Sequence, residues 1–324
     1  MPFARLAAAT TPTAHLGLGL AAVGRPGYIT LDRETELPHS RSVEALRERS
    51  FELLDAAYAS GVRYLDVARS YGRSEEFLAD WLHARPDIRD VVVGSKWGYT
   101  YTAAWRVDAE GPHEVKDHSA AAYARQRAET AEQLGDRLDL YQIHSVTPGS
   151  PALTDKELHA ALGELAASGV TVGLSVSGPE QAAAIRAALA VTVEGEPLFR
   201  TVQATYNLFE TSAGAALAEA HDAGLTVLVK EGVANGRLAG AHAPAALREV
   251  AVETGLGCDA VALAAVLRQP WTGVVLSGAA TPVQLVSNLH AAAVDLDEGQ
   301  LERLAGLVEE PAAYWERRGR LPWH

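Results

Sequence analysis

Short apolar runs alternate with longer amphipathic stretches along almost the whole chain. The apolar runs are rich in β-branched residues, and eight of them predict strands, at residues 14–20, 62–66, 91–96, 140–144, 170–175, 201–204, 226–230 and 273–277. The stretches between them are rich in Ala, Leu, Glu and Arg. They predict helices at 43–59, 75–84, 120–134, 155–167, 179–190, 213–223, 259–268, 282–293 and 298–309.

This strand–helix repetition predicts an α/β fold, a (β/α)8 TIM barrel formed by a single domain over residues 1–324. Glycine introduces several strands, as in SGVRYLDV and AGLTVLVK, which is typical of a helix that ends in a left-handed cap. A doubly wound open sheet is the alternative. That fold favours a G-x-G-x-x-G turn before its first helix, whereas the glycines of GLGLAAVG are not followed promptly by a helix. Residues 99–119 predict a long, lid-like loop.

Charge narrows the classes of partner. The net charge is −13 and the isoelectric point is near 5.3, so the surface repels phosphate backbones and anionic lipids, and we expect neither nucleic acid nor membrane as a partner. The single cysteine, Cys258, cannot form an internal disulfide. No run approaches the ~18 apolar residues that span a bilayer, and the N-terminal segment does not have the pattern of a signal peptide. We therefore expect a cytoplasmic protein.

Polar side chains close three consecutive predicted strands. The second strand ends in Asp66, with Tyr71 in the turn after it (RYLDVARSYG). The third ends in Lys96 (VVVGSKWG) and the fourth in His144 (DLYQIHSV). Each residue alone has a structural explanation, as a turn cap, a packing ring, an outward-reaching lysine or a core histidine. Since the carboxyl ends of barrel strands share one mouth, their coincidence predicts an active site.

Carbonyl reduction suits these four groups. The alkoxide that forms when a hydride reaches a carbonyl carbon must be protonated, and a tyrosine hydroxyl does this better if its pKa falls from about 10. Lys96 is expected to lower the pKa of Tyr71, and Asp66 to hold Lys96 in place. A neutral His144 is expected to orient and polarise the carbonyl oxygen.

The same motifs resemble the aldo-keto reductase family over essentially the whole chain. LDVARSYG, GSKWG and DLYQIHS are similar to the family's catalytic strand ends, and TVQATYNLFE, GLTVLVKEGVANGRLAG and LSGAATPVQLVSNLHAA to its last three strands. The resemblance implies an oxidoreductase that interconverts a small aldehyde or ketone and its alcohol, with Asp66, Tyr71, Lys96 and His144 as catalytic residues. It also implies extended binding of a nicotinamide cofactor without a Rossmann domain, with NADP(H) favoured over NAD(H). No metal is expected.

Cofactor contacts are implied in the same way. The resemblance places Ser175 and Gln203 at the carboxamide, and Gln284 and Asn288 at the adenine. With Lys230 and Gly278 added, the predicted cofactor-binding set is Ser175, Gln203, Lys230, Gly278, Gln284 and Asn288.

Three positions depart from the family pattern. Val176 stands where an Asn usually follows Ser175, and Lys230 replaces the aromatic residue that commonly stacks on the nicotinamide. The eighth-strand loop SGAATPVQ has no Arg or Lys for a 2′-phosphate, which weakens the preference for NADP(H). For Lys230, three roles remain open: pairing with Glu231, contacting the cofactor, or attracting an anionic substrate.

Two other functions compete with reduction. One is a cofactor-sensing, slow-turnover subunit, a role that some members of the family have. The other is a Schiff-base enzyme with Lys230 as the nucleophile. His113 and His118 match no metal-ligand spacing, so a solvated loop is expected there. The C-terminal segment PAAYWERRGRLPW fits two roles equally: shaping the substrate pocket, or packing as a tail on the surface of the barrel.

Overall fold

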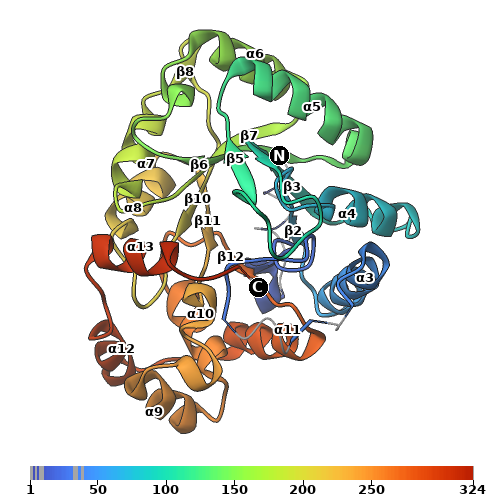
Figure 1. The fold of residues 1–324 in the computed structure, drawn as a ribbon. Coiled ribbons are helices and arrows are strands. Elements are labelled where there is room, and N and C mark those ends of the chain that lie inside the picture. The colour runs from blue at the N-terminus through green and yellow to red at the C-terminus, as the bar shows by residue number, and fades with distance from the viewer. Residues whose placement is uncertain (1–2, 4–5, 7–10, 32–35, 38–39, 324) are drawn as a thin grey trace.

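Eight parallel strands close into a barrel in a computed structural model, which describes residues 3, 6, 11–31, 36–37 and 40–323. The order around the barrel is β1-β12-β11-β10-β7-β6-β3-β2 (Figure 1). The strands are β1 Leu16–Gly19, β2 Tyr64–Asp66, β3 Val92–Trp97, β6 Leu140–Val146, β7 Thr171–Val176, β10 Thr201–Thr205, β11 Thr226–Lys230 and β12 Val274–Ser277. Because the first strand pairs with the last, as in Leu16 opposite Val275, the barrel prediction is confirmed and an open sheet is excluded.

Helices surround the barrel on its outer side (Figure 1). They are α3 Val43–Ala59, α4 Ser74–His83, α5 Ala120–Leu134, α6 Lys156–Ala167, α7 Gln181–Leu189, α8 Gly214–Asp222, α9 Ala245–Thr254, α10 Cys258–Leu267, α11 Pro282–Leu289, α12 Glu298–Ala305 and α13 Pro311–Gly319. Two of these helices, α9 and α13, lie outside the set that the sequence predicts. Within the described residues, no single helix has the length and hydropathy to cross a membrane. Helices α9 and α10 taken together have that length and hydropathy, but the chain bends by 89° between them.

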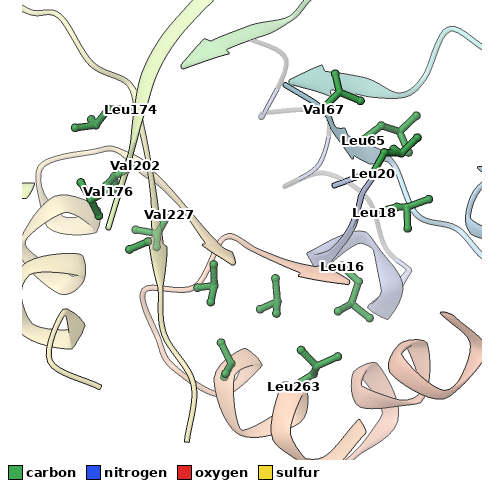
Figure 2. Packing of buried hydrophobic residues seen from close by; sticks show 14 of the residues in the cluster. Leu16, Leu18, Leu20, Leu65, Val67, Leu174, Val176, Val202, Val227 and Leu263 are labelled. Atoms are coloured by element: carbon green, nitrogen blue, oxygen red, sulfur yellow. The ribbon is translucent and has the colours of Figure 1, made fainter. Parts of the chain in front are cut away.

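Alternation along the strands creates two apolar regions. In β1, Leu16 and Leu18 belong to the large cluster that packs the strands against the helices, together with Leu263 of α10 (Figure 2). A smaller cluster includes Tyr64, Leu140 and other strand residues of the opposite parity. The barrel is therefore packed with side chains at one end, which leaves the other end for polar groups.

Helix ends follow the local sequence. Ser42 caps α3 by accepting a hydrogen bond from the backbone of Ala45, and Thr281 begins α11 with a capping box completed by Gln284. Gly61 adopts a positive φ of 89° before β2, as the glycine signals predicted.

Two segments flank the strand carboxyl ends. The expected lid-like loop carries a two-stranded hairpin, β4 Tyr99–Tyr101 and β5 Glu114–Lys116. After α13 the chain runs across the end of the barrel toward its centre (Figure 1), and there Trp323 stacks on His113 of the hairpin segment at 4.2 Å between centroids. A second hairpin, β8 Thr192–Val193 with β9 Glu196–Pro197, lies between α7 and β10 in the chain.

Candidate active site

The four candidate catalytic residues come together at the carboxyl ends of β2, β3 and β6. Asp66 is the last residue of β2, Lys96 lies one residue before the end of β3, His144 lies in β6, and Tyr71 follows β2. These three strands are neighbours in the barrel. Asp66, Tyr71 and His144 line a cavity of about 310 Å³, which is a volume that suits a small organic ligand.

Asp66 and Lys96 form a buried ion pair. The Lys96 ammonium donates to a carboxylate oxygen of Asp66 and, at 3.0 Å, to the Val67 carbonyl. The other Asp66 oxygen accepts from the Tyr64 hydroxyl at 3.0 Å and from the Gln203 amide at 3.1 Å. Both carboxylate oxygens of Asp66 therefore have a hydrogen-bond donor, and two acceptors hold the Lys96 ammonium in place.

Tyr71 and His144 face each other. The Tyr71 hydroxyl lies 3.4 Å from His144 Nε2, and their rings meet edge to face at 5.4 Å. On the other side of the imidazole, Nδ1 lies 3.4 Å from the Ser70 hydroxyl. Burial lowers the pKa of His144 well below its usual range, and the nearby charges of Lys96, Lys230 and Arg25 lower it further. The imidazole is therefore neutral, as the sequence reasoning expects for a group that orients a carbonyl.

The proton affinity of Tyr71 differs from the sequence-based expectation. Burial raises its pKa well above the usual range, and the Asp66 carboxylate raises it further, while Arg25 opposes both. Lys96 lies 4.8 Å from the ring centroid, but its charge is balanced by Asp66. The pair thus presents Tyr71 with little net charge, and Tyr71 is a protonated phenol in the protein alone.

A β-bulge near the end of β6 directs the His144 side chain into the cavity. The pairing of β6 with β7 slips between Ile143 and Val146, and Ser145 within the slip has a φ of 55°. The backbone N–H of Ser145 donates to the Ser175 hydroxyl at 2.8 Å. A bulge redirects side chains at a strand end, so this irregularity accounts for the direction of His144.

Three of the six implied cofactor-binding residues line the cavity, namely Gln203, Lys230 and Gly278. A Cβ added at Gly278 would meet nothing within 4 Å, so the backbone there is open to a ligand. Gly19 of the adjacent strand β1 lines the same cavity.

The other three engage the protein itself. Ser175 is fully buried against the β6 bulge. The Gln284 amide oxygen accepts from the backbone of Ala280 at 2.8 Å as part of the α11 cap. Asn288 donates to the Ser277 hydroxyl at 2.8 Å. Gln284 and Asn288 thus shape the loop after β12 that Gly278 belongs to.

Lys230 lies in the cavity and also contacts Glu231. Its ammonium donates to the Thr205 hydroxyl at 2.7 Å and lies 3.8 Å from a Glu231 oxygen. Burial lowers the pKa of Lys230 to about 8, although Glu231 opposes the shift. The Lys230 ammonium therefore pairs with Glu231 and also faces the cavity, so the two roles are compatible.

The pattern of polar residues at strand ends does not predict several of the residues that line the cavity. They come from the loop after β1, the β4–β5 hairpin and the C-terminal segment: Arg25, Tyr28, Tyr99, Glu114, Arg318 and Trp323. One sequence signal was available, since Arg25 stands alone among apolar, Gly and Pro residues in AAVGRPG, just beyond the first strand. The aromatic and basic C-terminus lies at the pocket, where Trp323 and Arg318 line it.

The solvated-loop prediction is wrong for His118. This side chain is 4% exposed, and its ring nitrogens lie 2.6 Å from the Ser150 hydroxyl and 2.8 Å from the His144 carbonyl oxygen. Burial lowers the pKa of His118 to about 4. The sequence does not indicate this burial, because the charged neighbours Lys116 and Asp117 are typical of a solvent-exposed loop. In the part of the chain that the structure describes, no cluster of His, Cys, Asp and Glu is arranged to hold a metal ion.

Comparison with known proteins identifies the family. The sequence model of the Aldo/keto reductase family matches residues 39–309. The chain belongs to the aldo/keto reductase family. Its members are generally NAD(P)H-dependent carbonyl reductases, so this chain is an oxidoreductase-family barrel, and the resemblance of its motifs is confirmed.

Several similar proteins span most of the chain. Aldo-keto reductase str7 of Strobilurus tenacellus is 27% identical over an alignment that covers 94% of this chain and 90% of that protein. Protein tas of Escherichia coli is 25% identical over 78% of this chain and 86% of its own length. A solved Pseudomonas aeruginosa protein, itself provisionally described as an aldo-keto reductase, superposes with a TM-score of 0.61 at 25% identity, covering 86% and 90% of the two chains.

Proposed function

We propose that this aldo/keto reductase reduces a small aldehyde or ketone with hydride from NAD(P)H, and catalyses the reverse oxidation. The observation that carries the proposal is the pairing of the Tyr71 hydroxyl with His144 Nε2, 3.4 Å apart, in a cavity shared with Asp66 and Gln203. A carbonyl oxygen within hydrogen-bond distance of both the phenol and the imidazole accepts a hydrogen bond from each.

The protein residues divide the chemistry among themselves. When bound, the reduced nicotinamide supplies a hydride, two electrons with one proton, to the carbonyl carbon. Tyr71 donates its hydroxyl proton to the carbonyl oxygen as negative charge develops there. The neutral His144 holds that oxygen in place, and Lys96, fixed by Asp66, lies 4.8 Å from the centre of the Tyr71 ring.

Features of the cavity fit a nicotinamide cofactor. Gly19 at the end of β1 and Gly278 just after β12 line it without side chains, and the Gln203 amide donates to Asp66. Lys230 adds a cation and Ser177 a hydroxyl to the lining. We propose Gln203, Lys230 and Gly278 as direct contacts of the cofactor, with Ser175, Gln284 and Asn288 as further contacts along its length.

We propose NADP(H) as the favoured form. Arg49 of α3 donates to the Ala280 carbonyl at 3.0 Å, which brings a guanidinium to the loop where the sequence offers no cation for a 2′-phosphate. An aryl-alcohol dehydrogenase of Phanerodontia chrysosporium named for NADP(+) is 40% identical over a short segment that covers 17% of this chain. A small-molecule carbonyl substrate and a cytoplasmic location complete the proposal.

The test combines binding and turnover. Quenching of protein fluorescence by NADPH and NADH gives the two dissociation constants, and a panel beginning with benzaldehyde gives reduction rates as loss of cofactor absorbance. The proposal expects saturable cofactor binding, with NADPH tighter, and reduction that Tyr71→Phe slows by roughly 10²–10⁴-fold. A protein that binds the cofactor but turns over nothing in the panel supports the sensor role instead.

A Schiff-base reaction is the second candidate, favoured by one observation. The Lys230 amine has its pKa lowered to about 8 by burial and lies in the same cavity as Tyr71. Borohydride added with a carbonyl compound and no cofactor would reduce an imine on Lys230 to a stable adduct. Mass spectrometry showing such an adduct, absent in Lys230→Met, supports this candidate over hydride transfer.

A further inference from the structure

Arg25 is a buried cation fixed against the ring of Tyr71. It lies in the loop after β1 and is 2% exposed. Its guanidinium carbon lies 5.3 Å from the Tyr71 ring centroid. One of its nitrogens donates to the carbonyl of Ser70, the residue before Tyr71, at 2.8 Å. Arg25 thus fixes the turn that carries Tyr71, and it places a positive charge beside the Tyr71 ring.

Glu114 on strand β5 binds the same guanidinium. The distance from Arg25 Nη1 to a Glu114 carboxylate oxygen is 2.8 Å, with side chains that are 3% and 23% exposed. Above them, Trp323 lies 4.8 Å from the guanidinium carbon and stacks on His113, which follows the hairpin loop. Because the Arg25 side chain is buried, its charge acts on its neighbours with less screening than an exposed charge would.

The charges around Tyr71 come from several elements. The charged or titratable groups that face it are Arg25 and Tyr28 after β1, Tyr64 and Asp66 of β2, Lys96 of β3, Glu114 of β5, His144 of β6 and Glu231 after β11. Lys96 and Asp66 are paired with each other, and His144 is neutral. Among the others, Arg25 lowers the pKa of Tyr71 while Glu114 and Glu231 raise it.

We propose that Arg25 is a positioning residue that stabilises the phenolate form of Tyr71, and that Glu114 weakens this effect by neutralising Arg25. The inference rests on the proposed role of Tyr71 as proton donor in reduction and proton acceptor in oxidation. It assigns to the loop after β1 and to the β4–β5 hairpin a part in the chemistry. Glu114 then affects the proton affinity of Tyr71 through its ion pair with Arg25.

Alcohol oxidation gives the sharpest test, because it requires the phenolate. The probe is benzyl alcohol, or the alcohol of the panel aldehyde that is reduced fastest, with saturating oxidised cofactor. Below the apparent pKa of the reaction, the rate follows the phenolate fraction and rises with pH. A charge within about 4–6 Å changes a pKa by roughly 1–3 units. At a fixed pH on the rising limb, Arg25→Met is expected to slow oxidation about tenfold or more.

Glu114→Gln is expected to act in the opposite direction. It keeps the shape of the side chain and removes the charge that balances Arg25, so the rising limb moves to lower pH and oxidation at the fixed pH becomes faster. Arg25→Lys keeps the charge and should lie within about threefold of wild type, which separates charge from packing. The matched control is Arg237→Met. Arg237 is also paired with a glutamate, Glu309, and lies 4.3 Å from the Phe209 ring, but it acts outside this cavity, so the rising limb should stay in place.

Opposite shifts by the two variants support the inference, whereas shifts in the same direction, or none, overturn it. If Arg25→Met does not fold, as judged by circular dichroism and cofactor binding, Glu114→Gln decides alone: a faster rate supports the inference, and an equal or slower rate overturns it. The proposed function fails separately. In that case the wild-type protein oxidises no alcohol, or Tyr71→Phe oxidises it as fast as wild type, which removes the basis of the inference as well.

Discussion

The Arg318 guanidinium holds both carboxylate oxygens of Glu231. The distances are 2.9 Å from Nε to one oxygen and 2.5 Å from Nη2 to the other. Glu231 follows β11 with a φ of 57°, and Arg318 belongs to α13. The contact joins the C-terminal helix to the barrel mouth, on the side where Lys230 enters the cavity.

This ion pair predicts an acid-side loss of stability. Burial alone would raise the pKa of Glu231, but Arg318 and Lys230 outweigh it and lower the pKa to about 2. A carboxyl with a lowered folded-state pKa stabilises the fold above its unfolded value, and this stability is lost as pH falls through the folded value. The contribution is about 3 kcal/mol near neutral pH. The free-energy difference between wild type and Glu231→Gln should therefore shrink from pH 6 toward pH 3, as measured by urea unfolding.

A surface pair provides the control for that prediction. Glu253 makes two hydrogen bonds with Arg303 at 2.8 and 2.5 Å, but the two side chains are each 42% exposed. Water screens such a pair, so Glu253→Gln should change stability little at any pH in the range. Equal pH profiles for the Glu231 and Glu253 variants would contradict the prediction.

Replacing Tyr71 with phenylalanine should remove the proton donor and leave the cavity shape. General acid catalysis contributes roughly 10²–10⁴-fold, so the reduction rate should fall by that factor while the dissociation constant of NADPH changes little. Tyr123→Phe is the control, because its hydroxyl lies 3.4 Å from the Ala161 carbonyl and its side chain does not line the cavity. A Tyr71→Phe protein that reduces its best substrate at the wild-type rate would remove Tyr71 from the mechanism.

Removing Lys96 should destabilise the fold as well as the reaction. Lys96→Met leaves the Asp66 carboxylate buried without its cation, and such a charge costs about 3–5 kcal/mol. Adding Asp66→Asn should restore part of the loss, because the remaining amide is neutral. Unfolding in urea measures both. The exposed pair Arg47–Asp80, with side chains 43% and 42% exposed, gives the control: Arg47→Met should cost less than about 1 kcal/mol. A double variant less stable than Lys96→Met would refute this account.

The candidate catalytic residues at the strand ends could be predicted from the sequence because one structural rule brings them together. Asp66, Lys96 and His144 follow apolar runs, and parallel strands bring their carboxyl ends to one mouth. Tyr71 follows from the same reasoning, since it lies in the turn after β2. The predicted strands and most predicted helices lie where the structure has them, with boundaries that differ by a few residues.

The rest of the site depends on contacts between loops far apart in sequence. Arg25, Glu114 and Trp323 meet only after the barrel closes, and no periodic pattern connects them. The burial of His118 was missed for the same reason, since its partners Ser150 and His144 lie 32 and 26 residues further along the chain. The expected effect of Lys96 on Tyr71 failed because the sequence shows which charges are near but not how closely each is paired.

Lys230 provides the last prediction, which concerns the redox state of the bound cofactor. Its ammonium lines the cavity with Tyr71 and His144, so we expect a nicotinamide that delivers hydride to a carbonyl held there to lie close to it. The oxidised ring is positive and the reduced ring is neutral. Two like charges about 5 Å apart repel by ~3 kcal/mol at an effective dielectric constant near 20, before screening and movement of the side chain. Wild type should therefore bind the reduced form preferentially, and Lys230→Met should raise the relative affinity for the oxidised form by about tenfold or more.

The pH dependence gives this prediction its sign. Burial lowers the pKa of Lys230 to about 8, so the amine is charged at pH 7 and largely neutral above pH 9. The ratio of oxidised to reduced dissociation constants, measured by fluorescence titration, should fall with rising pH in wild type and stay flat in Lys230→Met. Lys156→Met, an exposed lysine at the start of α6, should match wild type. If the ratio in Lys230→Met equals that of wild type at pH 7, Lys230 does not sense the nicotinamide charge. Its contacts with Thr205 and Glu231 then account for its place at the end of β11.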